Sequence, residues 1–327
     1  MRRITVNAPA RLHLGFLDLH GGLGRSFGSL GLTLAEVSTG VCVESGAGLR
    51  VEGPEALRAE KFAHRLLDRF GPGQGAHIRI DRSIPAHVGL GSGTQLALAI
   101  GTALSRLHGW DLEARHIAAL ADRGARSGIG IGAFNTGGFL VDGGKTAHGE
   151  APRIVARAEF PSQWRVLLVF DHYTQGLHGE CELAAFRGLP EFPESSAGEL
   201  CRLALMQVLP ALLEADFESF SSAIGRIQRT VGDYFAPAQG GRFASPLVAE
   251  VLSWLEAQGI RGIGQSSWGP TGFALLASET QAHAVARAAQ ARWGEAGLLR
   301  FQLCAGLNRG AMVDLLDYER RTSRLIS

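Results

Sequence analysis

The chain has 327 residues, 46% of them apolar, and a formal net charge of +1. This length allows two domains of ordinary size, or one large one, with a buried core, and the balanced charge argues against nucleic acid or a membrane as a partner bound mainly by charge. We expect a soluble, cytoplasmic protein, because we find no apolar run long enough to span a bilayer and no apolar signal core after Arg2 and Arg3.

The first half of the chain predicts a mixture of strands and helices. A helix is predicted at 55–69, where Leu57, Phe62 and Leu66 can share one face and a Gly-Pro pair follows. The other elements of this half are strands at 4–7, 11–19, 30–45, 77–81 and 138–142, a helix from about 96 to 107, and a helix at 111–124.

The polar, glycine-rich loop DGGKTAHGE predicts a domain boundary near residue 150. The later elements are strands within 153–160, 165–171, 272–277, 299–304 and 309–314, and helices at 178–188, 197–213, 215–232, 245–258 and 279–293. Because strands and helices do not alternate regularly, the pattern favours an α+β chain of two lobes, 1–150 and 151–327, over a doubly wound sheet.

Positive charge in this chain is almost entirely arginine, since Lys61 and Lys145 are its two lysines. An anion site must therefore use arginine, backbone N–H groups or a metal. The cysteines are widely spaced without a CxxC pair, so we expect reduced thiols and no zinc site; they are Cys42, Cys181, Cys201 and Cys304.

The stretch VGLGSGTQ, which leads into a predicted helix, is typical of an anion cradle. Gly89, Gly91 and Gly93 allow a tight turn, and the helix N-terminus adds positive potential. The hydroxyls of Ser92 and Thr94 suit a phosphate, a Mg²⁺ ion or a helix cap. A glycine-rich turn without a ligand remains the alternative. The stretch lacks the Gly-Lys pair of a P-loop and the third glycine of a dinucleotide fingerprint.

Residues 85–95, PAHVGLGSGTQ, resemble the second motif of the GHMP superfamily of small-molecule kinases, and residues 8–34 and 264–274 occupy the places of its first and third motifs. The resemblance implies a two-lobed GHMP-type fold, with a ribosomal protein S5 domain 2-like N-terminal domain and a ferredoxin-like α/β sandwich as the C-terminal domain. The chain departs from the kinases in one respect. No acidic residue lies between Arg123 and Val141, where the kinases carry an aspartate that assists the phosphoryl acceptor.

Three segments together, PAHVGLGSGTQ, RSGIGIGAFNTGGFLVDGG and GQSSWGPTGFA, are similar to the β-ribofuranosylaminobenzene 5′-phosphate synthase family of methanopterin biosynthesis. The resemblance implies a homodimeric, decarboxylating C-ribosyl transferase that joins 5-phosphoribosyl 1-diphosphate to 4-aminobenzoate. It implies Mg²⁺ as cofactor, with neither ATP nor a nicotinamide. The departing CO₂ leaves its electron pair in the ring, so bond formation needs no strong base, in agreement with the missing aspartate.

The candidate catalytic residues are Arg11, His13 and Asp18. Arg11 and His13 share one face of the predicted strand, where Arg11 could hold a carboxylate or phosphate and His13 the ribose. Asp18 could bind Mg²⁺ or a ribose hydroxyl. The simpler alternatives are a surface arginine, a packed histidine and a turn aspartate.

Binding residues are assigned from the same resemblance. Trp268 could stack on the arene or simply pack in the core. The expected diphosphate and phosphoribosyl ligands are Gly89, Gly91, Ser92, Gly93, Thr94, Gln95, Arg25, Ser26, Arg126 and Ser127, with Ser92 and Thr94 also weak candidates for Mg²⁺. The expected arene-binding residues are Asn135, Gln265, Ser266, Ser267, Trp268 and Thr271.

Two other functions stay open on the sequence. An ATP-dependent GHMP kinase would consume ATP, although the absent aspartate and the scarcity of lysine argue against it. A non-catalytic sensor on the same scaffold would bind a phosphate ligand without turnover. Neither nucleic acid nor a membrane is expected as a partner.

Overall fold

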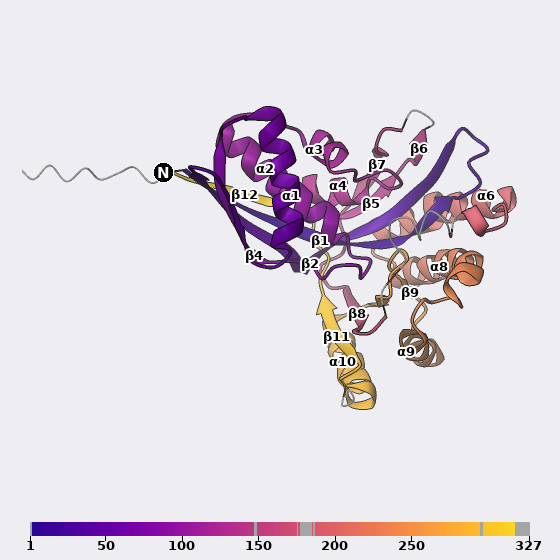
Figure 1. Ribbon diagram of the computed structural model, residues 1–327. Coiled ribbons are helices and arrows are strands. Elements are labelled where there is room, and N and C mark those ends of the chain that lie inside the picture. Colours follow the sequence, from indigo (N-terminus) through magenta and orange to yellow (C-terminus); the bar gives the residue numbers. More distant parts are fainter. Residues whose placement is uncertain are drawn as a thin grey trace, which may run out of the picture.

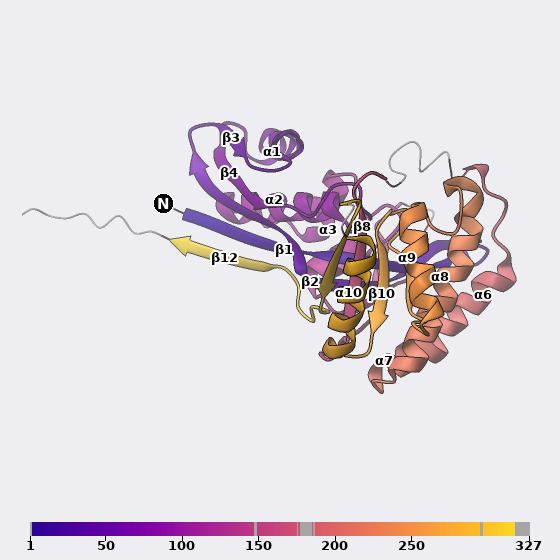
Figure 2. The same ribbon diagram turned by 90° about the horizontal axis from the view of Figure 1, so that it is seen from below.

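The computed structural model describes residues 2–146, 149–174, 176, 185, 187–294 and 297–317. Within these residues the chain forms two sheets with helices packed on them (Figures 1 and 2). Most of the helix predicted at 178–188 lies outside the described residues.

The first sheet is built around two long antiparallel strands, β1 and β2. Its strand order is β12-β1-β2-β4-β3, with β5 and β6 also paired to β2, and β7 paired to β5. The strands of this sheet in the described residues are β1 (Arg2–Asp18), β2 (Arg25–Gly46), β3 (Leu49–Glu52), β4 (Gly75–Arg82), β5 (Phe139–Asp142), β6 (Lys145–Thr146), β7 (Ile154–Ala158) and β12 (Met312–Asp317).

The burial of β1 changes along its length. Ile4, Val6 and Ala8 are buried in alternation, as expected for a strand with one covered face. After a register shift between Pro9 and Arg11, nearly every residue is buried. The first part of the strand therefore carries helices on one face only, whereas the second part is enclosed between the two lobes.

Four helices pack with this sheet and with one another: α1 (Ala56–Phe70), α2 (Ser92–His108), α3 (Ala114–Leu120) and α4 (Ile129–Asn135) (Figure 1). In α1, Phe62 and Leu66 are buried as predicted, but Leu57 is 77% exposed. The glycine-rich segment that forms α4 was not predicted to be helical, because glycine disfavours helices. Tertiary packing overrides this preference: a Cβ atom on Gly132 would lie 2.8 Å from Ile154.

The second sheet has the strand order β11-β8-β10-β9, antiparallel throughout. Its strands are β8 (Arg165–Asp171), β9 (Ile263–Gln265), β10 (Gly272–Leu276) and β11 (Leu299–Cys304), and the helices of this half are α6 (Glu194–Leu203), a π-helical turn η1 (Ala204–Val208), α7 (Leu209–Leu213), α8 (Phe217–Gln239), α9 (Pro246–Ala257) and α10 (Glu279–Trp293).

The chain does not change sheets at residue 150. β7 pairs with β5, and the whole of β12 pairs with the first residues of β1. β7 and β12 therefore belong to the first sheet. The chain thus enters the second sheet only at β8 and returns to the first with β12.

Residues 194–213 form a continuous helical stretch that is long and apolar enough to cross a membrane by length and composition. The expectation that no such run exists is therefore corrected. Leu200, Val208 and Leu212 are buried in the protein core. Such a stretch is weak evidence for a membrane span, because core helices of soluble proteins meet the same criterion.

Phe220 in α8 joins the core of the two halves. Its ring lies 5.6 Å from Phe139 in the first sheet, 6.1 Å from Phe160 and 5.1 Å from Trp164, and it is fully buried. Aromatic contacts of this kind stabilise a core beyond the area they bury.

We predict that Phe220→Ala lowers the free energy of unfolding by about 3–5 kcal/mol, the usual cost of deleting a buried ring. Urea denaturation measures the change. Leu213→Ala is the control, since Leu213 is 74% exposed and should cost less than about 0.5 kcal/mol. Equal losses from both substitutions would contradict the central position of Phe220.

Candidate diphosphate and substrate site

The glycine loop places the N-terminus of α2 at the edge of a cavity. Gly89 and Gly91 have φ angles of 82° and 83°, in the left-handed region that favours glycine. Gly91 is the N-cap of α2, and no side chain caps the helix there. The first turn of α2 therefore offers its positive end and its backbone N–H groups to an anion.

The cavity beside this loop has a volume of about 320 Å³. Arg11, Arg58, His87 and Arg123 line it, together with Gly89 and the loop residues from Gly91 to Thr94. None of the described residues that line it is Asp or Glu. An excess of positive charge without carboxylates suits a multiply charged phosphate ligand.

Gly93 leaves room for two guanidinium groups above the helix N-terminus. A Cβ atom on Gly93 would lie 2.0 Å from Nη2 of Arg58 and 3.2 Å from Cζ of Arg123. Arg58 comes from α1 and pairs with Glu55 at 3.3 Å. Burial and the neighbouring Arg58 lower the pKa of Arg123, although arginine remains cationic near neutral pH.

Arg11 fixes the loop to the sheet. Its Nη1 donates a hydrogen bond to the carbonyl oxygen of Gly89, and its backbone N–H donates to Leu90 at 3.2 Å. The Arg11 side chain also lines the cavity, so the structure places this predicted residue at the site.

His13 and Ser266 connect the glycine loop to the second sheet. The Oγ of Ser266 donates to the Gly89 carbonyl at 2.7 Å and accepts from the backbone N–H of His13 at 3.0 Å. A Cβ atom on Gly89 would lie 2.2 Å from the Ser266 carbonyl oxygen, so only glycine permits this approach. Ser266 therefore joins β1 and the loop and does not line the cavity itself.

The imidazole of His13 is buried against Phe16, with ring centroids 4.6 Å apart. Burial, followed by the charge of Arg11, lowers the pKa of His13 to about 3. Its Nδ1 accepts from the N–H of Gly15 at 3.3 Å, which assigns the proton to Nε2. His13 is thus a neutral, packed histidine, and its contact with the ribose stays a prediction.

Ser267 and Trp268 of the third glycine-rich segment line the cavity with Gly269. Trp268 is also packed: its ring lies 4.2 Å from that of Phe235 and is 3% exposed. The indole is therefore almost completely covered, and face stacking on an arene would require the ring to move.

Other predicted residues are held in structural hydrogen bonds away from the cavity lining. Gln265 accepts from the N–H of Ala244 at 2.7 Å, and Gln95 donates to the Gly130 carbonyl at 2.8 Å. Thr271 is fully buried. These side chains support the loops and do not reach the cavity.

The β1–β2 hairpin holds Asp18, Arg25 and Ser26. Asp18 accepts from the N–H groups of His20 and Gly21 at 3.0 and 2.7 Å, as a turn aspartate does. Arg25 donates to the carbonyl groups of Gly143 and Gly144, and Ser26 pairs with Lys145 in β6. None of the three lines the cavity.

The segment before α4 behaves similarly. Ser127 donates to the buried carboxylate of Asp142 at 3.0 Å, whose pKa burial raises. Asn135 lines a separate hollow with Thr102 and Phe134. Arg126, like these two, is outside the cavity lining.

The sequence did not single out Arg58 or His87. Arg58 belongs to a predicted amphipathic helix that carries several other basic residues, so its pattern gave no signal. His87 precedes the glycines and has a φ angle of 59°, a conformation uncommon for non-glycine residues that the sequence does not reveal.

Both halves of the chain match GHMP kinase domains. Residues 58–140 match the GHMP kinases N-terminal domain, and residues 208–295 match the GHMP kinases C-terminal domain. A homoserine kinase structure from Cytophaga hutchinsonii shares the fold, with a TM-score of 0.66, 18% identity and coverage of 95% of this chain and 97% of that one.

Two archaeal proteins are similar along almost their whole length. β-Ribofuranosylphenol 5′-phosphate synthase from Archaeoglobus fulgidus is 32% identical, over 95% of this chain and 100% of that protein. The enzyme of the same name from Methanothermobacter thermautotrophicus is 30% identical, over 95% and 98%. The chain belongs to the β-ribofuranosylphenol 5′-phosphate synthase family, within the GHMP superfamily.

The donor atoms around this cavity decide whether it could hold Mg²⁺. The described residues contain no group of three or more His, Cys, Asp or Glu side chains that could hold a metal. Mg²⁺ prefers carboxylate and phosphate oxygens, whereas the described side chains of the lining supply the hydroxyls of Ser92, Thr94 and Ser267, the imidazole of His87 and no carboxylate. The residues fit Mg²⁺ only as an ion carried by a ligand's own phosphate oxygens.

Gly93→Ser should move the Arg58 guanidinium off the helix N-terminus, because the new side chain would occupy its place. We expect a loss of at least about tenfold in kcat/KM, which corresponds to about 1.4 kcal/mol of transition-state binding, with little change in thermal stability. Steady-state kinetics and thermal melting measure the two effects. An unchanged kcat/KM would contradict this role of Gly93.

The lowered pKa of His13 predicts acid sensitivity. Between pH 6.5 and about 3 the unfolded chain binds a proton on this residue that the native protein does not, so stability falls as the pH falls through this window. Urea titrations at several pH values measure how the free energy of unfolding depends on pH. This dependence should be weaker for His13→Gln than for the wild type. His64→Gln, at an exposed position, is the matched substitution. Identical slopes for His13→Gln and wild type would contradict the assignment.

Proposed function

We propose that the chain is a decarboxylating C-ribosyl transferase that joins 5-phosphoribosyl 1-diphosphate to a para-substituted benzoate. The products are the ribosylarene 5′-phosphate, CO₂ and diphosphate, made in (tetrahydro)methanopterin biosynthesis. The observation that carries the proposal is the convergence of Arg11, Arg58 and Arg123 on an uncapped helix N-terminus, in a cavity without a described carboxylate.

Two candidate arenes differ in the substituent para to the carboxylate. The sequence resemblance implies 4-aminobenzoate, whereas the curated relatives are named for a phenol product, which the same reaction would form from 4-hydroxybenzoate. Both para groups donate electrons to the carbon that bears the carboxylate. We propose a benzoate with a para electron donor as the substrate class.

The reaction balances without an external acid or base. The ring carbon that bears the carboxylate attacks the anomeric carbon, while diphosphate departs with the electrons of the broken C–O bond. The C–CO₂ bond then breaks and its electron pair restores the aromatic ring. No ring proton has to be removed, so the absence of a described carboxylate from the cavity lining agrees with this chemistry.

The protein's part in this scheme is electrostatic. The negative charge that develops on the leaving diphosphate would be stabilised by Arg11, Arg58 and Arg123 and by the N-terminus of α2. These groups are held in place before the reaction, Arg11 by Gly89 and the helix by its packing on the sheet. We propose that Mg²⁺ arrives with the diphosphate and adds to the neutralisation of its charge.

One assay tests the function. We expect the protein, incubated with Mg²⁺, 5-phosphoribosyl 1-diphosphate and carboxyl-labelled 4-aminobenzoate or 4-hydroxybenzoate without ATP, to release labelled CO₂ and diphosphate. Arg123→Gln should lower the rate by about 10²-fold, as expected for loss of a group that stabilises transition-state charge. Arg69→Gln, an exposed position on α1, is the control and should leave the rate unchanged.

Folded protein that releases no CO₂ from either arene would contradict the proposal. ADP formation from ATP with a small alcohol or acid would instead support a kinase. Binding of the diphosphate donor without turnover would support a sensor.

A further inference from the structure

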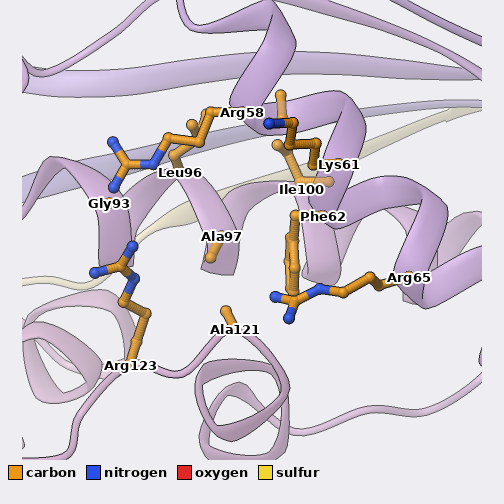
Figure 3. Close-up of a pocket in the computed structure, with 11 residues that line it drawn as sticks. Arg58, Lys61, Phe62, Arg65, Gly93, Leu96, Ala97, Ile100, Ala121 and Arg123 are labelled. Atoms are coloured by element: carbon orange, nitrogen blue, oxygen red, sulfur yellow. The ribbon is translucent and has the colours of Figure 1, made fainter. Parts of the chain in front are cut away.

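A second cavity opens beside the glycine loop, between α1, α2 and residues 121–123 (Figure 3). Its volume is about 360 Å³, within the range of small-molecule sites. We refer to it as the α1–α2 pocket. Its walls combine apolar side chains, among them Phe62 and Ala97, with four basic ones: Arg58, Lys61, Arg65 and Arg123.

The α1–α2 pocket is continuous with the diphosphate cavity. Gly93, Arg58 and Arg123 line both of them. Figure 3 shows these three residues at one end of the pocket, while Phe62 and Arg65 lie at the other end and Ala97 between. A ligand in the pocket would therefore present one end to the diphosphate cavity.

The chemistry of the pocket selects an aromatic anion. Phe62 and Ala97 are 6% and 7% exposed, so the walls are apolar core side chains. None of the described residues that line the pocket is Asp or Glu. A flat apolar body between such walls, with a negative group at a basic end, matches both features.

The basic end has positive charge to offer. Within the part of the chain that the structure describes, no hydrogen bond or ion pair engages the guanidinium of Arg123, which burial desolvates. Arg58 pairs with the partly buried carboxylate of Glu55 at 3.3 Å. At the far end, Arg65 already pairs with Asp122 at 3.3 Å. An anion is therefore best placed beside Arg58 and Arg123.

We propose that the α1–α2 pocket is the arene subsite, with the ring against Phe62 and Ala97 and the carboxylate directed at Arg58 and Arg123. This inference rests on the proposed function. The attacking carbon bears the carboxylate, so that end of the arene must face the diphosphate cavity, and the para substituent points toward Phe62. The two arginines then contact both substrates and hold the carbon that attacks beside the carbon that is attacked.

The first test fills the pocket. Ala97→Leu should raise the KM for the arene by about tenfold or more and leave that for 5-phosphoribosyl 1-diphosphate within about twofold, because the added side chain displaces only the ring. Equilibrium dialysis with labelled 4-aminobenzoate and 4-hydroxybenzoate checks binding directly. Ala103→Leu is the control, since Ala103 is buried in the same helix but does not line the pocket.

The second test fixes the orientation and does not depend on a core substitution that can fail to fold. Arg123→Gln should raise the arene KM by about tenfold, and by more than Arg65→Gln at the other end of the pocket, if the carboxylate lies at the Gly93 end. The opposite order would overturn the proposed orientation.

Several results would overturn the subsite. They are an unchanged arene KM in Ala97→Leu, an equal rise in the KM of the diphosphate donor, or ATP binding to the wild type that is lost in Ala97→Leu. The first two results can occur while the wild-type protein still releases CO₂, so they reject the subsite and not the proposed function. The third result would point to a nucleotide in the pocket. Wild-type protein that forms no product with either arene would instead reject the proposed function, and the subsite with it.

Discussion

The carbonyl oxygen of Gly89 is the point on which the site depends. Arg11 in β1 and Ser266 before β10 both donate hydrogen bonds to it, and Ser266 in turn accepts from His13. Three segments far apart in the sequence are thereby held at one place. A side chain at position 89 would collide with the Ser266 carbonyl, so the geometry requires glycine there.

The position of this loop determines where positive charge gathers in the cavity. The loop aims the N-terminus of α2 into a space where Arg58 and Arg123 already lie, and Gly93 leaves the volume that their guanidinium groups occupy. The kinases of this superfamily bind a nucleotide and carry an aspartate that assists the phosphoryl acceptor. Here the described lining carries three arginines and no carboxylate, an arrangement suited to a reaction in which an anion leaves and no proton is withdrawn.

The sequence predicted the two-lobed α+β fold and the glycine loop because local sequence patterns indicate both. Hydrophobic periodicity located α1 and α8 approximately, and the glycines with the following helix located the cradle. It failed where tertiary packing decides. Nothing local distinguishes Arg58 from the other arginines of α1, since its role depends on where α1 lies against α2.

Polar residues near the glycines are a second place where the sequence alone does not decide. Asp18, Arg25 and Ser127 look chemically capable, and the structure occupies them with backbone groups and a buried carboxylate. A polar side chain beside glycines has two uses, ligand binding and the support of a turn, and a single sequence shows the same residue types for both. Only the hydrogen-bond partners separate them.

The pairing of β1 with β12 has a consequence for biosynthesis. Arg2 faces Asp317 across this pair, so during synthesis β1 waits for a partner strand made several hundred residues later. Until then β1 presents an unpaired edge, and such edges are templates for pairing with other chains. The contact also raises the mean sequence separation of native contacts, which slows folding. The first sheet is thus completed only after the strands of the second sheet have been made, and we expect the growing chain to be the state most prone to aggregate.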